Sequence, residues 1–61
     1  MKKEFLTVKE VAGLLQLNIL TIYDYIRTGK LKAIQFGRMY RIQNKELYRF
    51  INKHEVNGKD L

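Results

Sequence analysis

Residues 7–29 of the chain read TVKEVAGLLQLNILTIYDYIRTG, and they contain the clearest structural pattern of the sequence. Thr7 and Glu10 have the spacing of a capping box, in which the Thr7 hydroxyl accepts from the Glu10 N–H and the Glu10 carboxylate reaches back. Apolar residues then recur at i, i+3, i+4 and i+7, the spacing of one helix face; they are Val8, Val11, Ala12 and Leu15. The pattern predicts a helix over about residues 8–15.

A second helix is predicted directly after the first. Asn18 is a good N-cap residue, and Ile19, Ile22 and Ile26 repeat at helical spacing behind it. Gly29 suits the left-handed backbone position that often follows a helix end. Two helices joined by about three residues, the second of them short and capped, have the outline of a helix-turn-helix motif.

Residues 34–42 alternate between apolar and polar side chains around a tip that contains Gly37. A three-residue tip, residues 37–39, pairs Phe36 with Tyr40, whereas a two-residue tip places Arg41 on the face of Ile34 and Phe36. The three-residue tip puts all the apolar members on one face, namely Ile34, Phe36, Tyr40 and Ile42. The pattern therefore favours a β-hairpin with a three-residue tip, with Arg38 at its exposed end.

A third helix is predicted over about residues 45–54, with Asn44 as its N-cap and Glu46 in its first turn, where the helix dipole favours an acid. Residues 1–6 are expected to be a polar lead-in, and residues 55–61 a frayed tail because they show no periodicity. The predicted fold class is mainly α with a small β-hairpin, a winged helix-turn-helix. We expect it to form a single domain over residues 1–54.

The net charge of the chain is concentrated in one segment. The 61 residues contain 12 Lys and Arg against 6 Asp and Glu, which gives +6. Residues 1–26 and residues 46–61 each sum to zero, so the excess lies in residues 27–45; its members are Arg27, Lys30, Lys32, Arg38, Arg41 and Lys45. A block of one sign is typical of a surface that binds phosphates, although a merely soluble basic surface is the alternative.

Composition excludes several other classes. The chain has no cysteine and one histidine, so neither a disulfide framework nor a metal site is expected, and no cofactor is expected. There is no apolar run of the length that crosses a membrane, so we expect a cytoplasmic protein, associated with the nucleoid when bound. The sequence contains no cysteine nucleophile, paired carboxylates or P-loop, so we do not expect an enzyme.

The basic residues fall on the predicted elements that contact DNA in a winged helix-turn-helix. In a winged helix-turn-helix the second helix enters the major groove, and the hairpin contacts the neighbouring backbone or the minor groove. The positive residues lie at the end of the second predicted helix, in the hairpin and at the start of the third helix. The sequence therefore predicts double-stranded DNA binding.

Several segments also resemble the excisionase-family helix-turn-helix domain, which is related to the MerR-like winged helix. They are LTVKEVA at 6–12, LN at 17–18, TIY at 21–23, IRTGKL at 26–31 and FGRMYRI at 36–42. The resemblance covers residues 5–52. It implies a small DNA-binding protein that acts either as an excisionase, a recombination directionality factor beside an integrase, or as a transcriptional regulator.

The chain departs from this family at four positions. Members usually have glycine where this chain has Gln16, so we expect a positive φ there. Ile19 and Leu20 occupy positions that are commonly polar, and Asp24 stands where arginine or another polar residue is common. Asp24 has two interpretations: it accepts from a cytosine amine, or it has no DNA role and forms an ion pair with Arg27 or is solvated beside Thr28.

The candidate DNA-binding residues are Asn18, Thr21, Tyr23, Asp24, Arg27, Lys30, Lys32, Gln35, Arg38 and Arg41. Arg27 either contacts guanine or phosphate, or serves as a cation at the helix C-terminus. Arg38 is expected to enter a narrow minor groove. Tyr23 either reaches a phosphate or packs half-buried beside the isoleucine stripe. Asn18 is expected to cap the helix and to contact a phosphate.

Four of the five remaining candidates are expected to contact the DNA backbone. Lys30 and Lys32 are predicted phosphate contacts that set register without reading sequence. Gln35 and Arg41 are both expected to project from the outer face of the hairpin, where they can grip the backbone. Thr21 is placed on the solvent-facing side of the second helix.

The predicted partners are double-stranded DNA and, on it, an integrase or recombinase or further cooperatively bound copies of the chain. No membrane partner is expected. No heptad repeat follows the third helix, so we expect a monomer or weak oligomer in the free state. The alternative is a protein-interaction module on a winged-helix scaffold, which Asp24, Ile19 and Leu20 favour and the clustered charge opposes.

Overall fold

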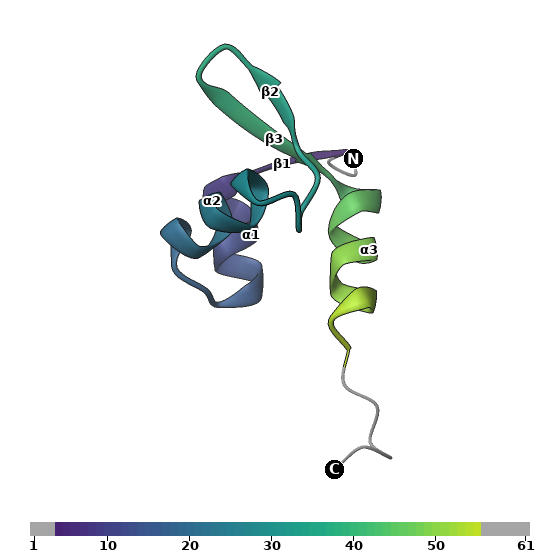
Figure 1. The fold of residues 1–61 in the computed structure, drawn as a ribbon. Helices are drawn as coiled ribbons and strands as arrows, with labels where there is room; N and C mark the ends of the chain where they lie inside the picture. The colour runs from purple at the N-terminus through teal and green to yellow at the C-terminus, as the bar shows by residue number, and fades with distance from the viewer. Residues whose placement is uncertain (1–3, 56–61) are drawn as a thin grey trace.

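The structure is a computed structural model, and it describes residues 4–55. This part of the chain contains three helices and a three-stranded antiparallel sheet of order β1-β3-β2. The elements are β1 (Phe5–Thr7), α1 (Val8–Leu15), α2 (Ile19–Arg27), β2 (Ile34–Phe36), β3 (Met39–Gln43) and α3 (Asn44–Lys53). Figure 1 shows the β2–β3 hairpin projecting beyond the helices, with α1 and α2 on one side of the molecule and α3 on the other.

The start of α1 confirms the predicted capping box. The Thr7 Oγ1 accepts from the Glu10 N–H at 3.0 Å, and the Thr7 N–H donates to the Glu10 Oε1 at 2.9 Å. The helix ends at Leu15, and its C-cap Gln16 has a φ of 55° in the left-handed region, as the resemblance to the family predicted. The Leu17 N–H then donates to the Ala12 carbonyl at 2.9 Å and closes the turn.

The ends of α2 were also predicted from local signals. The Asn18 Oδ1 accepts from the Leu20 N–H at 2.8 Å, which confirms Asn18 as the N-cap. At the other end, Gly29 adopts a φ of +82°. The Lys30 N–H donates to the Tyr25 carbonyl at 2.8 Å, so the chain turns back sharply after the helix.

The strand β1 begins where the sequence predicts a polar lead-in over residues 1–6, and that prediction was wrong for residues 5 and 6. β1 pairs antiparallel with β3, with Leu6 opposite Ile42, and both of these side chains are buried. Three residues are too few to show the alternation that identifies a strand. The formation of β1 therefore depends on its pairing with β3, which lies more than 30 residues further along the chain. Residues 1–3 of the predicted lead-in lie outside the described residues.

The hairpin tip has two residues rather than the three that the sequence favoured. Phe36 pairs with Met39 and Ile34 pairs with Arg41, which leaves Gly37 and Arg38 as the tip. Gly37 has a φ of +61°, and a positive φ at the first of two central residues is what a type II′ hairpin turn requires. The conformational freedom of this glycine therefore decides the register, against the apolar pattern.

This register divides the predicted apolar face. Tyr40 and the fully buried Ile42 face the core, whereas Ile34 and Phe36 lie on the opposite, outer face and are 36% and 54% exposed. Arg41 shares that outer face, because it pairs with Ile34. The expectation that all four apolar side chains share one face was therefore wrong.

The start of α3 differs from the prediction by one residue. Asn44 is the first helical residue, and Gln43 takes the N-cap position without a side-chain cap bond. The Asn44 N–H donates to the Glu4 carbonyl at 3.0 Å, so the start of the helix is tied to the chain that enters β1. The helix ends at Lys53, and Glu55 has no regular structure. The remainder of the predicted tail, residues 56–61, lies outside the described residues.

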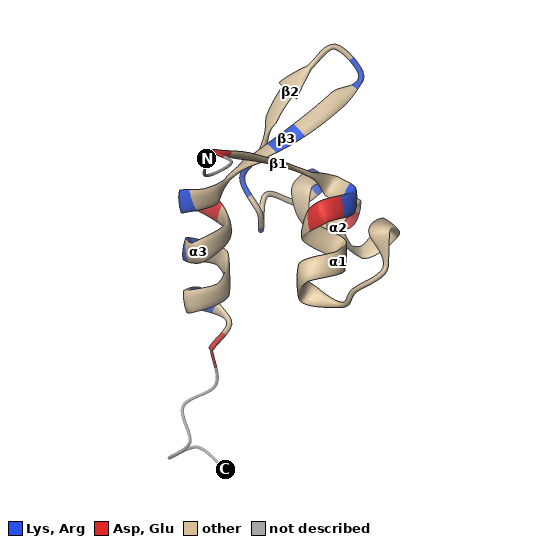
Figure 2. Ribbon diagram, turned by 180° about the vertical axis from the view of Figure 1, so that it is seen from behind, with Lys and Arg blue, Asp and Glu red and all other residues tan. Residues whose placement is uncertain are grey.

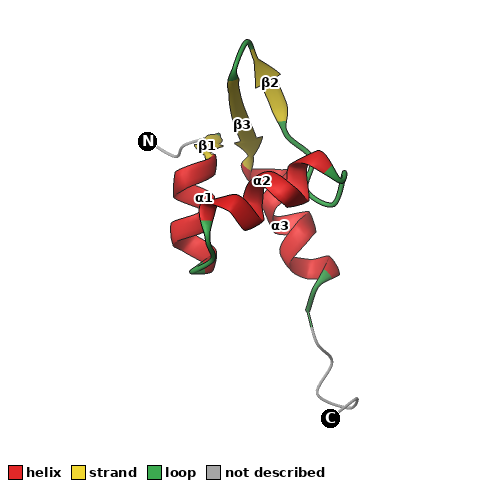
Figure 3. Cartoon of the chain, turned by 60° about the vertical axis from the view of Figure 1, so that its left-hand side comes forward, coloured by secondary structure: helices red, strands yellow, loops and turns green. Residues whose placement is uncertain are grey.

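The core receives side chains from each helix, from β1 and β3, and from the loop between α2 and β2. Its buried members are Leu6, Val8, Val11, Ala12, Ile22, Leu31, Ile42, Leu47 and Phe50. Figure 3 shows how the helices gather below the sheet, so that the hairpin alone extends away from this core. None of the helices in residues 4–55 is both long and apolar enough to cross a membrane.

Candidate nucleic-acid interface

The exposed side of α2 is formed by residues at helical spacing. Leu20, Tyr23, Asp24 and Arg27 follow one another at i, i+3, i+4 and i+7, and all of them are exposed. Ile22, on the other side of the helix, is completely buried and fixes which face turns outward. Thr21 was predicted to lie on the solvent-facing side of this helix, and in the structure it is only partly exposed.

Tyr23 connects this face to the hairpin. Its ring meets the ring of Tyr40 edge-on, with 6.0 Å between the centroids and 65° between the planes. Tyr23 nevertheless remains 44% exposed, so it both packs and presents its surface to solvent. Between α2 and β3 there is a shallow hollow of about 590 Å³ lined by Leu20, Thr21, Tyr23, Asp24, Arg27 and Tyr40.

Asp24 and Arg27 form an ion pair on the surface of α2, which is one of the two interpretations that the sequence left open for Asp24. The side chains are 55% and 77% exposed. An exposed pair of this kind contributes about 0–1 kcal/mol to stability. Its main effect is therefore to hold the guanidinium group against the helix while leaving it accessible to a ligand.

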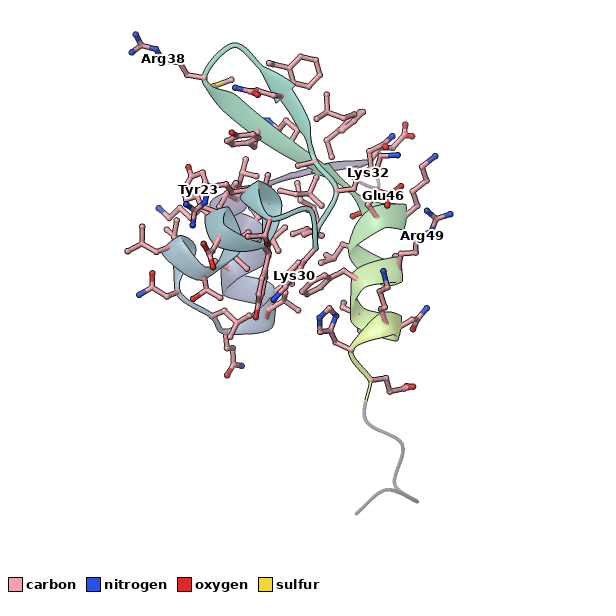
Figure 4. The ribbon with its side chains drawn as sticks, viewed as in Figure 1. Tyr23, Lys30, Lys32, Arg38, Glu46 and Arg49 are labelled. Carbon is pink, nitrogen blue, oxygen red and sulfur yellow. The ribbon has the colours of Figure 1, made fainter. Side chains whose placement is uncertain are left out.

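Arg38 stands at the tip of the hairpin. Figure 4 shows its side chain pointing away from the tip, on the same side of the molecule as Tyr23. Gln35 lies just before the tip, and its Nε2 donates to the Gly37 carbonyl at 3.0 Å. Gln35 therefore supports the turn that presents Arg38.

The three-residue tip predicted that Arg41 and Gln35 lie side by side on the outer face of the hairpin, and the structure shows that they do not. Gln35 pairs with Tyr40 and Arg41 pairs with Ile34, so the two side chains belong to opposite faces of the sheet. The Arg41 Nη1 donates to the Tyr40 carbonyl at 2.9 Å. This half-buried guanidinium group is held along its own strand, on the face that carries Phe36 and Met39.

Lys30 and Lys32 lie apart from the exposed side of α2. The Lys30 Nζ is 5.8 Å from the centroid of the Tyr25 ring, close enough for a cation–π contact. In Figure 4, Lys32 lies with Glu46 and Arg49 beside α3, on the side of the molecule away from Tyr23 and Arg38. The basic block of the sequence is thus not one patch in space, and Figure 2 shows basic positions spread over several elements.

The structure therefore gathers some of the predicted site residues and separates others. Around the hollow and the hairpin tip lie Thr21, Tyr23, Asp24, Arg27, Gln35 and Arg38, with Asn18 at the N-terminus of α2. Three residues that belong to the basic surfaces were missed: Tyr40, Arg49 and Lys53. Tyr40 was placed only on the apolar face of the predicted hairpin. The i, i+4 spacing of Arg49 and Lys53 was the signal that could have identified one helix face.

The fold and this arrangement define the class of protein. Residues 5–55 match the helix-turn-helix domain family, so the chain belongs to this excisionase-like family, and the family prediction is confirmed.

The relatives of the chain include "Uncharacterized protein YvgK" of Bacillus subtilis (strain 168), which is 43% identical over 44 residues; these are 72% of this chain and 14% of that protein. "Putative DNA-binding protein Rv0500A" of Mycobacterium tuberculosis (strain ATCC 25618 / H37Rv) is 36% identical over 47 residues, which are 77% of this chain and 60% of that protein. The chain thus spans less than two thirds of the length of either relative. No solved structure matches the chain.

Proposed function

We propose that this chain binds double-stranded DNA by placing α2 in the major groove and the β2–β3 hairpin, as a wing, on the adjacent backbone or minor groove. The observation that carries the proposal is that the exposed face of α2 and the tip residue Arg38 lie on the same side of the molecule. With its side chains, an α-helix such as α2 has a diameter of about 10–12 Å, and the major groove, about 12 Å wide, accepts such a helix.

The side chains of this surface have distinct proposed roles. Arg27 addresses a guanine edge or a phosphate, and Asp24 either orients it or accepts from a cytosine amine. Thr21, Tyr23 and Asn18 lie where they can contact the backbone beside the groove. Arg38 and Gln35 contact the neighbouring minor groove or backbone. Arg41, Lys30 and Lys32 belong to other faces, so on this surface they are not the principal contacts.

In the cell, we propose an excisionase-like accessory role in recombination or a small transcriptional regulator's role. Domains of this family bind DNA and are typically not enzymes, which supports a binding function. One helix of this size reads only a few base pairs, so a recombinase or further copies bound beside it would supply the remaining specificity.

The salt dependence of binding to a short, mixed-sequence duplex tests the proposal. Arg27 and Arg38 stand on the proposed surface, and each phosphate neutralised adds about −0.9 to the slope of log affinity against log salt concentration, so we expect a slope of about −2. Single-stranded DNA of the same length is the control and should bind more weakly. If the protein binds neither at low salt, the proposal is wrong.

A protein-interaction module is the second candidate, favoured by Leu20. This side chain is 74% exposed at the start of α2, at the edge of the hollow. If the surface serves a protein partner, Leu20→Ser should abolish capture of that partner even at high salt, while Arg27→Ala and Arg38→Ala should not. The reverse pattern favours DNA.

A further inference from the structure

A second hollow lies on the other side of the molecule, between α3 and the loop that follows α2. It has a volume of about 460 Å³, and we call it the α3 groove. The residues that characterise its lining are Lys30, Lys32, Glu46, Arg49, Phe50 and Lys53. The separation of Lys32 and Arg49 from Tyr23 and Arg38 in Figure 4 shows that it is distinct from the exposed side of α2.

Both walls of the α3 groove are held in place by packing. The loop wall is anchored by Leu31, which is 1% exposed between the two lysines, and by its N–H donating to the Tyr25 carbonyl at 3.1 Å. Because alternate residues of the loop are buried and exposed, Lys30 and Lys32 both project outward. Tyr25 also stacks on Phe50, with 5.1 Å between the ring centroids, and so joins the end of α2 to α3.

The other wall presents cations of its own. Arg49 and Lys53 are four residues apart on α3 and share a helix face. Glu46 lies in the same wall, and its Oε1 is 3.8 Å from the Arg49 Nη1. The Glu46 side chain is 11% exposed and that of Arg49 is 79% exposed, so the surface that a ligand meets is dominated by the cation.

The chemistry of this lining suits phosphates. Among the described residues that line the α3 groove, four are cations and one is an acid. Phe50 is buried, and the strongly exposed apolar side chains of the protein, such as Leu20, Phe36 and Tyr48, lie elsewhere. Protein interfaces are built around apolar and aromatic anchors, whereas DNA backbone contacts are made by Lys and Arg. The α3 groove therefore favours a DNA backbone over an acidic protein segment.

We propose that the α3 groove is a second DNA-binding surface, which holds phosphates of a DNA segment outside the one that α2 reads. This inference rests on the proposed function. The phosphates come either from the flank of the same duplex or from a second duplex, and both sources present the same chemistry. Arg49 and Lys53 are then DNA contacts in addition to the predicted set.

The test compares a short duplex of about one helical turn, or about 10 base pairs, with a long duplex of about three turns, or about 30 base pairs. The double variant Arg49→Gln/Lys53→Gln should bind the short duplex as the parent does. On the long duplex it should bind at least tenfold more weakly, with a slope of log affinity against log salt concentration flatter by about 1.8, because two phosphate contacts are lost. Lys9→Gln/Lys45→Gln, at exposed positions outside the groove lining, is the charge-matched control.

A bridging experiment distinguishes the two sources. Capture of a labelled short duplex by a bead-bound short duplex, lost in the double variant, identifies a second duplex. A long-duplex effect without capture identifies the flank. Circular dichroism checks that the double variant is folded at the temperature of the binding assay. If it is not, Lys53→Gln alone, at an exposed site without a described ion pair, replaces it in the same test.

Two outcomes overturn the proposal. If the double variant and its control bind the long duplex alike, the α3 groove contacts no DNA, while short-duplex binding by the parent still supports the function of α2. If the double variant loses affinity for both lengths equally, Arg49 and Lys53 belong to the same DNA-binding surface as the exposed side of α2 and not to a separate one. If the parent binds neither duplex, the proposed function itself has failed.

Discussion

Gln16 holds a left-handed backbone conformation at the end of α1, with a φ of 55°. This conformation costs an L-residue with a side chain about 1–2 kcal/mol, and glycine adopts it without that strain. The residue is exposed, and its N–H donates to the Gly13 carbonyl at 3.2 Å. The turn between the two helices is therefore strained at a single position.

We expect Gln16→Gly to stabilise the protein. Relief of the strain outweighs the added freedom of the unfolded chain, so the free energy of unfolding should rise by about 0.5–1 kcal/mol, or a few degrees in Tm. Thermal unfolding followed by circular dichroism measures it. Lys9→Gly, at an exposed helical position, is the control and should lower Tm; a decrease in Tm for Gln16→Gly would contradict the argument.

Asp24 sets the electrostatics of the α2 surface through its ion pair with Arg27. We expect Asp24→Asn to remove a carboxylate that repels phosphates, to free the Arg27 guanidinium group, and thus to bind mixed-sequence duplex several-fold more tightly. Glu4→Gln adds the same charge at an exposed position away from α2 and serves as the control. Binding equal to that of this control would mean that the ion pair does not restrain Arg27, and weaker binding would indicate a direct contact from Asp24 to the DNA.

At the scale of single elements, α1 contains a glycine that its packing does not require. A Cβ added at Gly13 meets no atom within 4 Å, and the residue is exposed in the helix interior. Gly13→Ala should therefore raise the free energy of unfolding by about 0.5–1 kcal/mol, because alanine has the higher helix propensity. Urea denaturation measures the change. Gly29→Ala, where φ is +82°, should instead destabilise the protein, and a gain there would show that φ does not govern these positions.

The elements differ in how well local sequence could predict them. The bounds of α1 and the caps at Thr7 and Asn18 follow from interactions within four residues, so the sequence was sufficient. The strand β1 and the register of the hairpin depend on partners far along the chain and on one glycine at the tip. The apolar alternation was misleading there because this small sheet leaves Ile34 and Phe36 on an exposed outer face.

At the scale of the whole molecule, the net charge of each sequence segment did not show where the basic side chains lie in space. The block from Arg27 to Lys45 divides between the exposed side of α2 with the hairpin tip, the outer face of the sheet and the α3 groove, and Lys45 lies outside the groove lining. Arg49 and Lys53 were counted in a neutral segment, because Glu55 and Asp60 offset them in sequence. The DNA-binding family could thus be predicted from the residues, whereas the division of the basic surface required the positions of α3 and the loop.

Arg27 and Arg38 should therefore differ in their effect on binding. Arg27→Ala should cost about 1–3 kcal/mol on a selected target site and relax its sequence preference, as expected for a base contact. Arg38→Ala should weaken binding to selected and mixed sequences alike and flatten the slope of log affinity against log salt concentration by about 0.9. Binding titrations on both duplexes, with Lys9→Ala as the control, measure these effects. Parental affinity in both variants would remove these residues from the interface.

The chain passes from β3 into α3 between Gln43 and Asn44 with no loop residue, and the Asn44 N–H is bonded to the Glu4 carbonyl. The strand and the helix are therefore continuous at this junction. The hairpin strand β3 and the helix α3 are two parts of one backbone segment, Met39–Lys53. Arg38 adjoins one end of this segment and Arg49 and Lys53 lie near the other, so the fold itself sets the spacing between the two proposed DNA contacts.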